Sequence, residues 1–266
     1  MKKKVLVTGA NGQLGLTFKE LFEKNSECEF TFISKSDLDI SKVDDLKRIF
    51  ESNKYDYCIN CAAYTNVEQA EKTPAIAFEI NAQAVKLLAK QCKSHDIILI
   101  HISTDYVFDG KKKEPYIISD DTNPLNVYGK SKLQGELYIS EICEKYYTIR
   151  TSWLYSKKHG KNFYKTILGK IGNTEEIRIT DAQLGCPTNC ENLAKHIYKN
   201  IILKTPMFGI SHFSDNVEMT WYDFAKAILK ENNAFDKVKL ILDNNYVTFA
   251  KRPQYSVLKS TELIGR

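Results

Sequence analysis

The feature that most constrains the fold is a glycine-rich segment directly after the first apolar run of the chain. Residues 5–8 have the composition of a buried strand, and Gly9, Gly12 and Gly15 follow with the spacing Gly-x-x-Gly-x-x-Gly. Glycine permits a tight strand-to-helix turn, and the amides of such a turn can hold a pyrophosphate. The segment therefore predicts a dinucleotide-binding loop made of Gly9, Asn11, Gly12, Gln13, Leu14 and Gly15.

Apolar, β-branched runs alternate with helical periodicity over the first half of the chain. The expected strands span residues 5–8, 30–33, 57–60, 97–103 and 147–150, and the expected helices span 14–24, 43–52, 74–94 and 127–143. This alternation predicts an α/β fold, a Rossmann-type doubly wound parallel sheet with helices on both faces. Such sheets bind ligands at the carboxyl ends of their strands, where the motifs of this chain fall.

The alternation ends after Arg150. Helices are expected over residues 162–171, 192–203 and 220–231, with a strand near 177–180. We expect residues 1–152 to form the dinucleotide-binding domain. Residues 153–266 should mainly form a smaller C-terminal substrate-binding cap, with some segments returning to the sheet. Because no linker rich in glycine or proline separates the halves, the cap should pack against the sheet.

Composition and charge exclude several classes of protein. No apolar run approaches the roughly 20 residues that span a bilayer, and Met1-Lys2-Lys3-Lys4 leads into a strand rather than a signal peptide. We therefore expect a cytoplasmic protein with no membrane partner. The net charge is +5, but the lysines are dispersed and lack the pattern of a nucleic-acid module, so no nucleic-acid partner is expected.

The seven cysteines are odd in number and lie in apolar surroundings. This indicates reduced thiols that serve as small core residues. Cys58 and Cys61 could form a zinc site together with Cys186 and Cys190. Cys58 falls within an expected buried strand, however, and the second pair is loosely spaced, so no metal site is expected.

A tyrosine, a lysine and a strand-terminal hydroxyl point to carbonyl chemistry. Tyr128 and Lys132 would lie one helical turn apart, where the ammonium should lower the phenol pKa from its ordinary value of about 10. Thr104, at the end of an expected strand, can hydrogen-bond a substrate oxygen. The spacing alone is common on exposed helices. Together the three residues predict proton donation from Tyr128 to a carbonyl.

The residues after the second expected strand bear on the choice of nicotinamide cofactor. A carboxylate there would bind a ribose 2′-hydroxyl and repel a 2′-phosphate, but this chain has Ser34 and Lys35. NADPH is therefore favoured, while Asp37 keeps NADH open. Asp39 and Ile40 are candidates for adenine contacts, although Asp39 could equally cap the following helix.

Seven ordered motifs resemble the extended short-chain dehydrogenase/reductase family, and within it the dTDP-4-dehydrorhamnose reductases. They are VTGANGQLG at 7–15, NCAAYT at 60–65, STDYVFDG at 103–110, NPLNVYGK at 123–130, RTSW at 150–153, GCPT at 185–188 and RPQYSVL at 252–258. The resemblance spans most of the chain.

The resemblance implies an enzyme in which NADPH or NADH delivers hydride to the C4 keto carbon of dTDP-4-dehydro-L-rhamnose. Tyr128 would supply the proton, Lys132 would hold the nicotinamide ribose and Thr104 would bond the sugar oxygen. Asp105 and Trp153 would line the sugar pocket. Simpler interpretations are that Thr104 ends a strand, Asp105 caps a turn and Trp153 belongs to the core.

The resemblance also places Ala62, Ala63 and Tyr64 beside the cofactor, where small residues allow a close approach. Arg252 is a candidate for the substrate diphosphate, because a guanidinium matches that geometry, with a plain surface role as the alternative. Ile102 stands where some relatives carry a bulkier aromatic residue. The chain stops at Arg266, whereas the family usually continues through another helix, which puts the completeness of the cap in question.

Two other functions remain open. One is reduction of a different nucleotide-linked 4-keto deoxysugar. The other is a non-catalytic, NADP-binding subunit resembling the regulatory partner of methionine adenosyltransferase, against which the presence of Thr104, Tyr128 and Lys132 argues. The sequence contains no persuasive acidic cluster for the metal-mediated dimer of some relatives, but it allows a homodimer.

Overall fold

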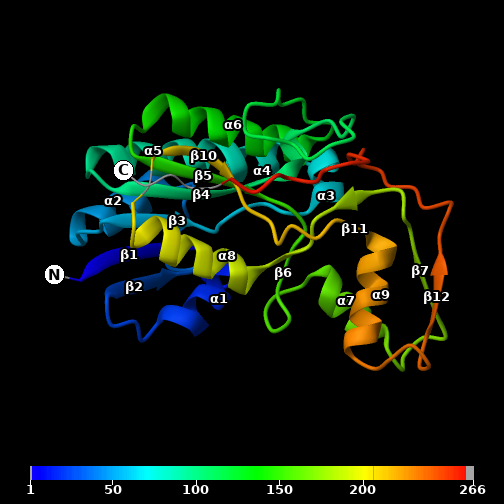
Figure 1. Cartoon of the computed structure of the whole chain (residues 1–266). Coiled ribbons are helices and arrows are strands. Elements are labelled where there is room, and N and C mark those ends of the chain that lie inside the picture. The colour runs from blue at the N-terminus through cyan, green and yellow to red at the C-terminus, as the bar shows by residue number, and fades with distance from the viewer. Residues whose placement is uncertain (1, 206, 262–266) are drawn as a thin grey trace.

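One six-stranded parallel sheet organises the computed structural model, which describes residues 2–205 and 207–261. The strand order is β10-β5-β4-β3-β1-β2. The strands are β1 (Lys3–Thr8), β2 (Cys28–Ile33), β3 (Tyr57–Asn60), β4 (Ile98–Thr104), β5 (Tyr146–Thr151) and β10 (Gly209–His212). Helices cover both faces of the sheet (Figure 1). The predicted Rossmann-type fold is confirmed.

Alternate residues of each strand separate two hydrophobic cores. Val5 and Val7 pack on the side of α1, α8 and the π-helix η3, whereas Leu6 packs on the side of α2, α5 and α6. The bounds of these helices are α1 (Gln13–Phe22), α8 (Cys190–His196), η3 (Ile197–Ile202), α2 (Val43–Ser52), α5 (Ala84–Ser94) and α6 (Val127–Ile142). A sheet buried on both faces explains why its strands read as continuous apolar runs.

Segments from the second half of the chain also belong to this sheet layer. β10 pairs in parallel with β5, and α8 and η3 pack into the core beside α1. The strand β10 was not predicted, because Gly209–His212 contains polar residues and no β-branched run; Ser211 and His212 are nevertheless buried. The division into residues 1–152 and 153–266 stays a prediction.

The other second-half elements form a smaller lobe at one end of the sheet (Figure 1). Its core is built from α7 (Phe163–Lys170), α9 (Trp221–Glu231), β7 (Glu176–Ile179) and β12 (Lys239–Leu242). Short paired strands connect the lobe to the sheet: β6 (Leu154–Tyr155) with β9 (Thr188–Asn189), and β8 (Leu184–Gly185) with β11 (Met219–Thr220). A capping box between Thr220 and Asp223 begins α9.

The helix expected over residues 74–94 is divided into three segments. They are α4 (Pro74–Phe78), the π-helix η1 (Glu79–Gln83) and α5. Within η1, the Asn81 side chain accepts from the Tyr64 amide at 2.8 Å and donates to the Tyr64 carbonyl and to Ser131 Oγ. These bonds hold the segment after β3, which includes α3 (Val67–Lys72), against α6.

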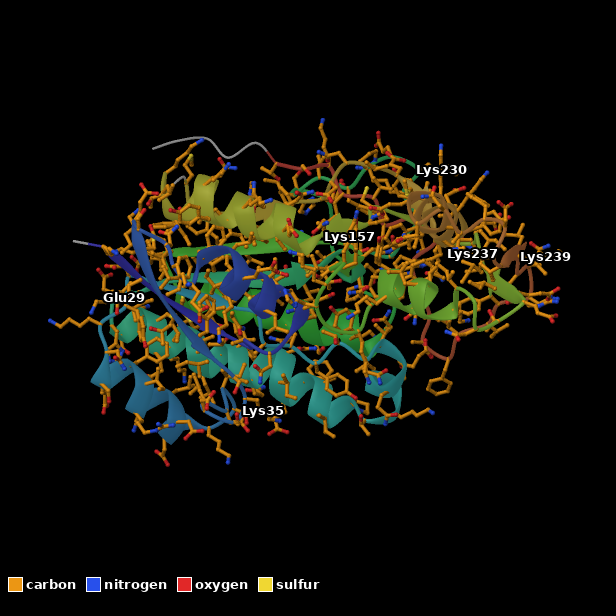
Figure 2. All side chains as sticks on the ribbon, turned by 90° about the horizontal axis from the view of Figure 1, so that it is seen from below. Glu29, Lys35, Lys157, Lys230, Lys237 and Lys239 are labelled. Carbon is orange, nitrogen blue, oxygen red and sulfur yellow. The ribbon has the colours of Figure 1, made fainter. Side chains whose placement is uncertain are left out.

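Charged side chains are spread over both lobes. Lys230, Lys237 and Lys239 lie on the smaller lobe, and Glu29 and Lys35 on the larger one (Figure 2). Within the described ranges, no helix is long and apolar enough to cross a membrane. All seven cysteines belong to those ranges and are unpaired. Residues 262–266 lie outside the described ranges, and so does the expectation about the short C-terminus.

A buried ion pair joins α6 to the sheet. Glu136 on α6 accepts from Arg150 on β5, with Nη2 to Oε2 at 2.7 Å and Nε to both carboxylate oxygens at 3.1 Å. Both side chains are at most 4% exposed. Ser103 on β4 also donates to Glu136. Three elements are thus connected through one carboxylate beneath the end of the sheet.

We expect Arg150→Met to lower the free energy of unfolding by about 3–5 kcal/mol, because Glu136 would remain buried without its cation. Urea denaturation followed by circular dichroism measures the loss. Adding Glu136→Leu should recover most of it, since the unpaired carboxylate is then removed as well. A double variant as unstable as the single one would contradict this explanation.

Candidate active site

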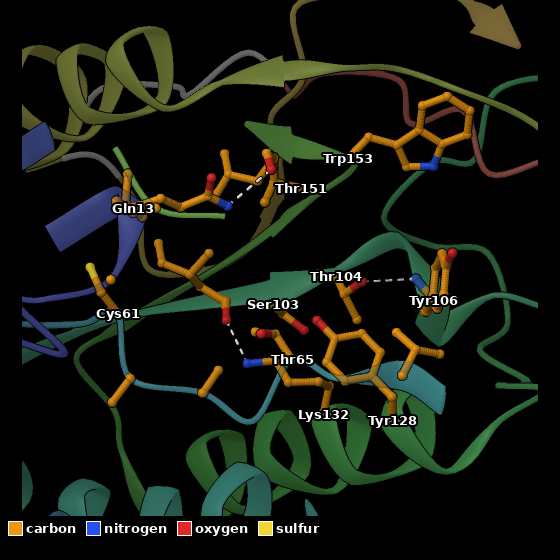
Figure 3. Close-up of a pocket in the computed structure, with 18 of the residues that line it drawn as sticks. Gln13, Cys61, Thr65, Ser103, Thr104, Tyr106, Tyr128, Lys132, Thr151 and Trp153 are labelled. Carbon is orange, nitrogen blue, oxygen red and sulfur yellow. Dashed lines mark hydrogen bonds between the residues drawn. The ribbon is translucent and has the colours of Figure 1, made fainter. Parts of the chain in front are cut away.

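A cavity of about 560 Å³ lies at the carboxyl end of the sheet, between the two lobes (Figure 3). Its volume suits a small-molecule site. The predicted site residues that line it are Asn11, Gly12, Gln13, Leu14, Ala62, Ala63, Thr104, Asp105, Tyr128, Lys132 and Trp153. The fold therefore brings together residues that are up to 142 positions apart in the chain, from Asn11 to Trp153.

The glycine-rich loop requires its glycines for two different reasons. Gly9 has a φ of +66°, and a Cβ there would lie 2.6 Å from the Ala62 nitrogen. A Cβ on Gly15 would lie 2.5 Å from the Gly9 carbonyl oxygen. Gly9 and Gly15 thus shape the turn from behind, outside the lining of the cavity. Gly12 is the N-cap of α1. No side chain caps the first amides of this helix, so they can donate hydrogen bonds to a bound anion.

Gln13 connects the glycine-rich loop to the smaller lobe. Its Nε2 donates to the Leu154 carbonyl at 3.0 Å, a bond drawn in Figure 3, and its Oε1 accepts from Asn162 at 3.1 Å. Gly160 packs against the same side chain, with no room for a Cβ. The next residue, Lys161, lines the cavity and brings a cation that the sequence analysis missed.

The candidate residues that follow β2 lie outside the lining of the cavity. Ser34 donates through its amide and its hydroxyl to the Asp37 carboxylate, at 3.1 and 2.6 Å. Lys35 is exposed, and Arg48 of α2 donates to the Asp37 carbonyl at 2.9 Å. The Asp37 carboxylate is therefore held by Ser34, while the cations Lys35 and Arg48 lie on either side of the loop.

Asp39 and Ile40 have local structural roles. The Asp39 carboxylate accepts from the amide and the hydroxyl of Ser41, at 3.1 and 2.7 Å. This closes the turn before α2, although Lys42, not Asp39, is the N-cap of that helix. Ile40 is buried in the core beside α2. Tyr64 is held through its backbone by Asn81, also outside the cavity lining. Cofactor contacts by these residues stay predictions.

Tyr128 and Lys132 lie one turn apart near the start of α6, as expected. The helix begins at the N-cap Asn126, which accepts from the Gly129 amide at 2.8 Å and donates to the Lys251 carbonyl at 2.8 Å. A Cβ on Gly129 would lie 2.2 Å from the Tyr106 carbonyl oxygen. The close approach at Gly129 therefore brings the Tyr128 ring to the end of β4, where it contacts Tyr106 edge to face.

Burial, rather than the lysine, controls the acidity of the phenol. Burial raises the pKa of Tyr128, while a hydrogen bond with Thr104 lowers it. The prediction that Lys132 lowers the pKa of Tyr128 is therefore wrong, because burial dominates. The Nζ of Lys132 is instead directed to the Ile102 carbonyl at 2.6 Å and to His101 Nε2 at 3.1 Å. Figure 3 shows the bond to Ile102.

Thr104 and Asp105 form a polar edge of the cavity beside the Tyr128 ring. Thr104 Oγ1 donates to Asp105 Oδ1 at 3.0 Å and accepts from the Tyr106 amide at 3.2 Å. Burial raises the pKa of Asp105 to about 7, against the lowering effect of hydrogen bonds from Ser256 and Thr104. A carboxyl that titrates near neutrality can donate to or accept from a sugar hydroxyl.

Trp153 is clamped between two neighbours. Its indole stacks on Trp221 with ring centroids 3.6 Å apart and planes 6° apart. A Cβ on Gly185 would lie within 2.8 Å of the indole atoms Cε2, Cζ2 and Nε1, so Gly185 allows the close approach of the backbone to the ring. The backbone of Trp153 has a φ of +45°, a strained conformation for a bulky residue. The stack covers one face of the indole, and Gly185 crowds the atoms around Cε2, while Trp153 still lines the cavity.

Arg252 does not belong to the lining of the cavity. Its guanidinium donates to Glu68 of α3 at 2.9 Å, and its side chain is 20% exposed. A contact with the substrate diphosphate stays a prediction.

The cavity also contains residues that the sequence analysis did not single out. Asn60, Lys161 and Trp221 line it. The capping-box pattern of Thr220 and Asp223 marks Trp221 as the first residue of a helix, but nothing local places that residue against Trp153.

A family model described as the RmlD substrate binding domain matches residues 2–265. The chain belongs to this family. The resemblance to the dTDP-4-dehydrorhamnose reductases that the motifs indicated is thereby confirmed, and with it membership of the extended short-chain dehydrogenase/reductases.

Relatives agree with this assignment over nearly the whole chain. The dTDP-4-dehydrorhamnose reductase of Aggregatibacter actinomycetemcomitans is 37% identical, over 98% of this chain and 92% of that protein. The dTDP-4-keto-6-deoxy-D-glucose reductase of Streptomyces niveus is 33% identical, over 97% and 89%. The crystal structure of the dTDP-4-dehydrorhamnose reductase of Bacillus anthracis in complex with NADP aligns with a TM-score of 0.93 and 34% identity, over 100% and 96%.

The stacked pair Trp153 and Trp221 can be tested directly, because the chain has no other tryptophan. We expect a far-ultraviolet exciton couplet in circular dichroism that disappears in both Trp221→Leu and Trp153→Leu. A double-mutant cycle of unfolding free energies should give a coupling of about 0.5–1.5 kcal/mol. Additive losses, together with an unchanged dichroism signal in the single variants, would rule out the stack.

Proposed function

We propose that the protein is an NAD(P)H-dependent reductase of the C4 keto group of dTDP-4-dehydro-L-rhamnose, forming dTDP-L-rhamnose for nucleotide-sugar biosynthesis. The observation that carries the proposal is the meeting of the glycine-rich loop with Thr104, Tyr128 and Lys132 in one cavity. The named activities of the relatives in Aggregatibacter and Bacillus support this substrate. A cytoplasmic location and a homodimer are further predictions from the sequence.

The site has the features that a dinucleotide needs. The uncapped amides at the start of α1 would hold the pyrophosphate, and Ala62 and Ala63 leave space beside them. Lys132 would bind the nicotinamide ribose. When bound, the cofactor supplies the hydride for the keto carbon.

Tyr128 would supply the proton to the sugar oxygen. Reduction requires the phenol in its protonated form, and the raised pKa of Tyr128 keeps it protonated at neutral pH. Thr104 lies next to the phenol, where its hydroxyl would bond the same oxygen and orient the carbonyl. Lys132 would stabilise the phenolate that proton transfer leaves behind.

The sugar and the diphosphate would occupy the part of the cavity bordered by the smaller lobe. Asp105 would bond a sugar hydroxyl, and Trp153, held by its stack on Trp221, would contact the sugar from the lobe side of the cavity. Lys161 lines the cavity and is a candidate for the diphosphate, along with Arg252.

The loop after β2 favours NADPH over NADH. Lys35 and Arg48 bring two cations, and the Asp37 carboxylate already accepts two hydrogen bonds from Ser34. We expect Lys35→Glu to raise the dissociation constant for NADPH by about 10-fold or more, with a smaller change for NADH, because the new carboxylate repels the 2′-phosphate. Cofactor fluorescence titrations measure both constants. Equal effects on the two cofactors would contradict this role of Lys35, and Lys35→Gln separates loss of the cation from repulsion.

The decisive assay supplies dTDP-4-dehydro-L-rhamnose, made in place by upstream enzymes, and follows oxidation of NADPH and of NADH by absorbance. Formation of dTDP-L-rhamnose is the expected result. The name of the Streptomyces relative favours a second candidate, reduction of another 4-keto deoxysugar. Oxidation only with such a sugar would support it, and tight cofactor binding with no turnover of either sugar would favour the regulatory-subunit alternative.

We expect Tyr128→Phe to keep cofactor affinity and to lose turnover by about 10²-fold or more, the effect of removing a general acid. Steady-state kinetics and fluorescence titration measure the two quantities. Tyr106→Phe is the matched control, because it removes a neighbouring phenol hydroxyl and leaves the proton donor in place. Similar turnover in Tyr128→Phe and in the unmodified protein would disprove the assignment.

A further inference from the structure

A chain of buried polar side chains runs beneath the cavity from β1 to α6. Thr8 Oγ1 donates to Asn60 Oδ1 at 2.8 Å, Asn60 Nδ2 lies 3.1 Å from His101 Nδ1, and His101 Nε2 lies 3.1 Å from Lys132 Nζ. All four side chains are at most 2% exposed. The proposed reaction uses neither Asn60 nor His101.

The backbone determines the orientation of the Asn60 amide. One end of that amide faces the Ala62 N–H at 3.2 Å, as well as the Thr8 hydroxyl. A backbone N–H can only donate, so the atom that it faces must be the oxygen. The other end is therefore the NH₂ group, which donates to His101 Nδ1.

This direction determines where His101 carries its proton. Nδ1 accepts from Asn60, so it has no hydrogen, and the neutral imidazole must carry its proton on Nε2. An imidazolium would set an N–H of the ring against the NH₂ of Asn60. Burial and the neighbouring Lys132 also lower the pKa of His101, which favours the neutral ring.

We propose that Asn60 selects the Nε2–H tautomer of His101, whose N–H then donates to Lys132 Nζ, so that His101 is a positioning residue for Lys132. Nζ donates to the Ile102 carbonyl at 2.6 Å and accepts from His101, which requires a neutral amine. An ammonium has no lone pair with which to accept. The hydrogen-bond pattern therefore favours Lys132 in its unprotonated form.

The other titratable groups around Lys132 also affect its pKa, and with it the balance between amine and ammonium. Tyr128 and Glu136 approach from α6, Cys61 from the segment after β3 and His101 from β4. Burial lowers the pKa of Lys132 to about 8, while Glu136 and Cys61 raise it. The N–H of His101 acts in the same direction as burial, because it stabilises the amine.

The catalytic consequence of this arrangement rests on the proposed function. An ordinary lysine, with a pKa of about 10.4, holds its proton too tightly to exchange it readily near neutral pH. Lys132 instead titrates close to the working range, with the ammonium as the form that stabilises the Tyr128 phenolate. We therefore expect kcat/KM to fall as the pH rises through the pKa of Lys132.

The tautomer is measured on the native protein, without substrate or cofactor, by two-bond ¹H–¹⁵N correlation spectra. His101→Gln assigns the His101 signals among the five histidines of the chain. We expect a protonated Nε2 and an unprotonated Nδ1. A protonated Nδ1, in either the other tautomer or the imidazolium, would overturn the proposal. This result does not depend on which sugar, if any, the protein reduces.

Asn60→Asp tests the effect on Lys132. The carboxylate of the variant still accepts from Thr8 and Ala62, but it cannot donate to His101 and instead accepts from Nδ1–H. The lone pair of His101 Nε2 is then free to accept from the ammonium form of Lys132. We expect the basic limb of the kcat/KM profile to move up by about 1 pH unit or more. Thr8→Val, which removes a different bond of Asn60, should leave the limb in place. An unmoved limb in folded Asn60→Asp, or an equal shift in Thr8→Val, would refute the proposal; if Asn60→Asp does not fold, the spectra of the native protein decide.

Discussion

The parallel register of the central strands is the constraint on which the site depends. Thr8 pairs with Asn60 and Asn60 with His101, so the ends of β1 and β3 lie level while β4 continues for three more residues to Thr104. The chain leaves the sheet after β3, and the end of β4 that extends past β3 becomes one wall of the cavity. The same register aligns the buried side chains that reach Lys132, so the glycine-rich loop and Tyr128 share one edge of the sheet.

Docking of α6 brings Tyr128 and Lys132 to this edge. Glu136 joins the helix to Arg150 of β5 and Ser103 of β4, and Gly129 allows its first turn to approach Tyr106. The helix is thereby fixed along its length. Its position determines which way Nζ of Lys132 is directed: toward His101 and the Ile102 carbonyl.

The smaller lobe is tied to the same site by Gln13 and the two tryptophans. Gln13 bonds to Leu154 and Asn162 on the lobe side of the cavity. Trp221 holds Trp153 in a strained backbone conformation against Gly185. A lobe fastened at these points holds the walls of the cavity in place around a ligand.

The sequence by itself determined the local parts of this protein: the glycine-rich turn, the strands of the first half, and the spacing of Tyr128 and Lys132, because these depend on the preferences of neighbouring residues. Only the tertiary structure decided the rest. Burial raised the Tyr128 pKa where a neighbouring ammonium predicted the opposite. The strand β10, the stack of Trp153 on Trp221 and the bonds of His101 each join segments far apart in the chain. Their partners are set by packing and desolvation, which no local pattern records.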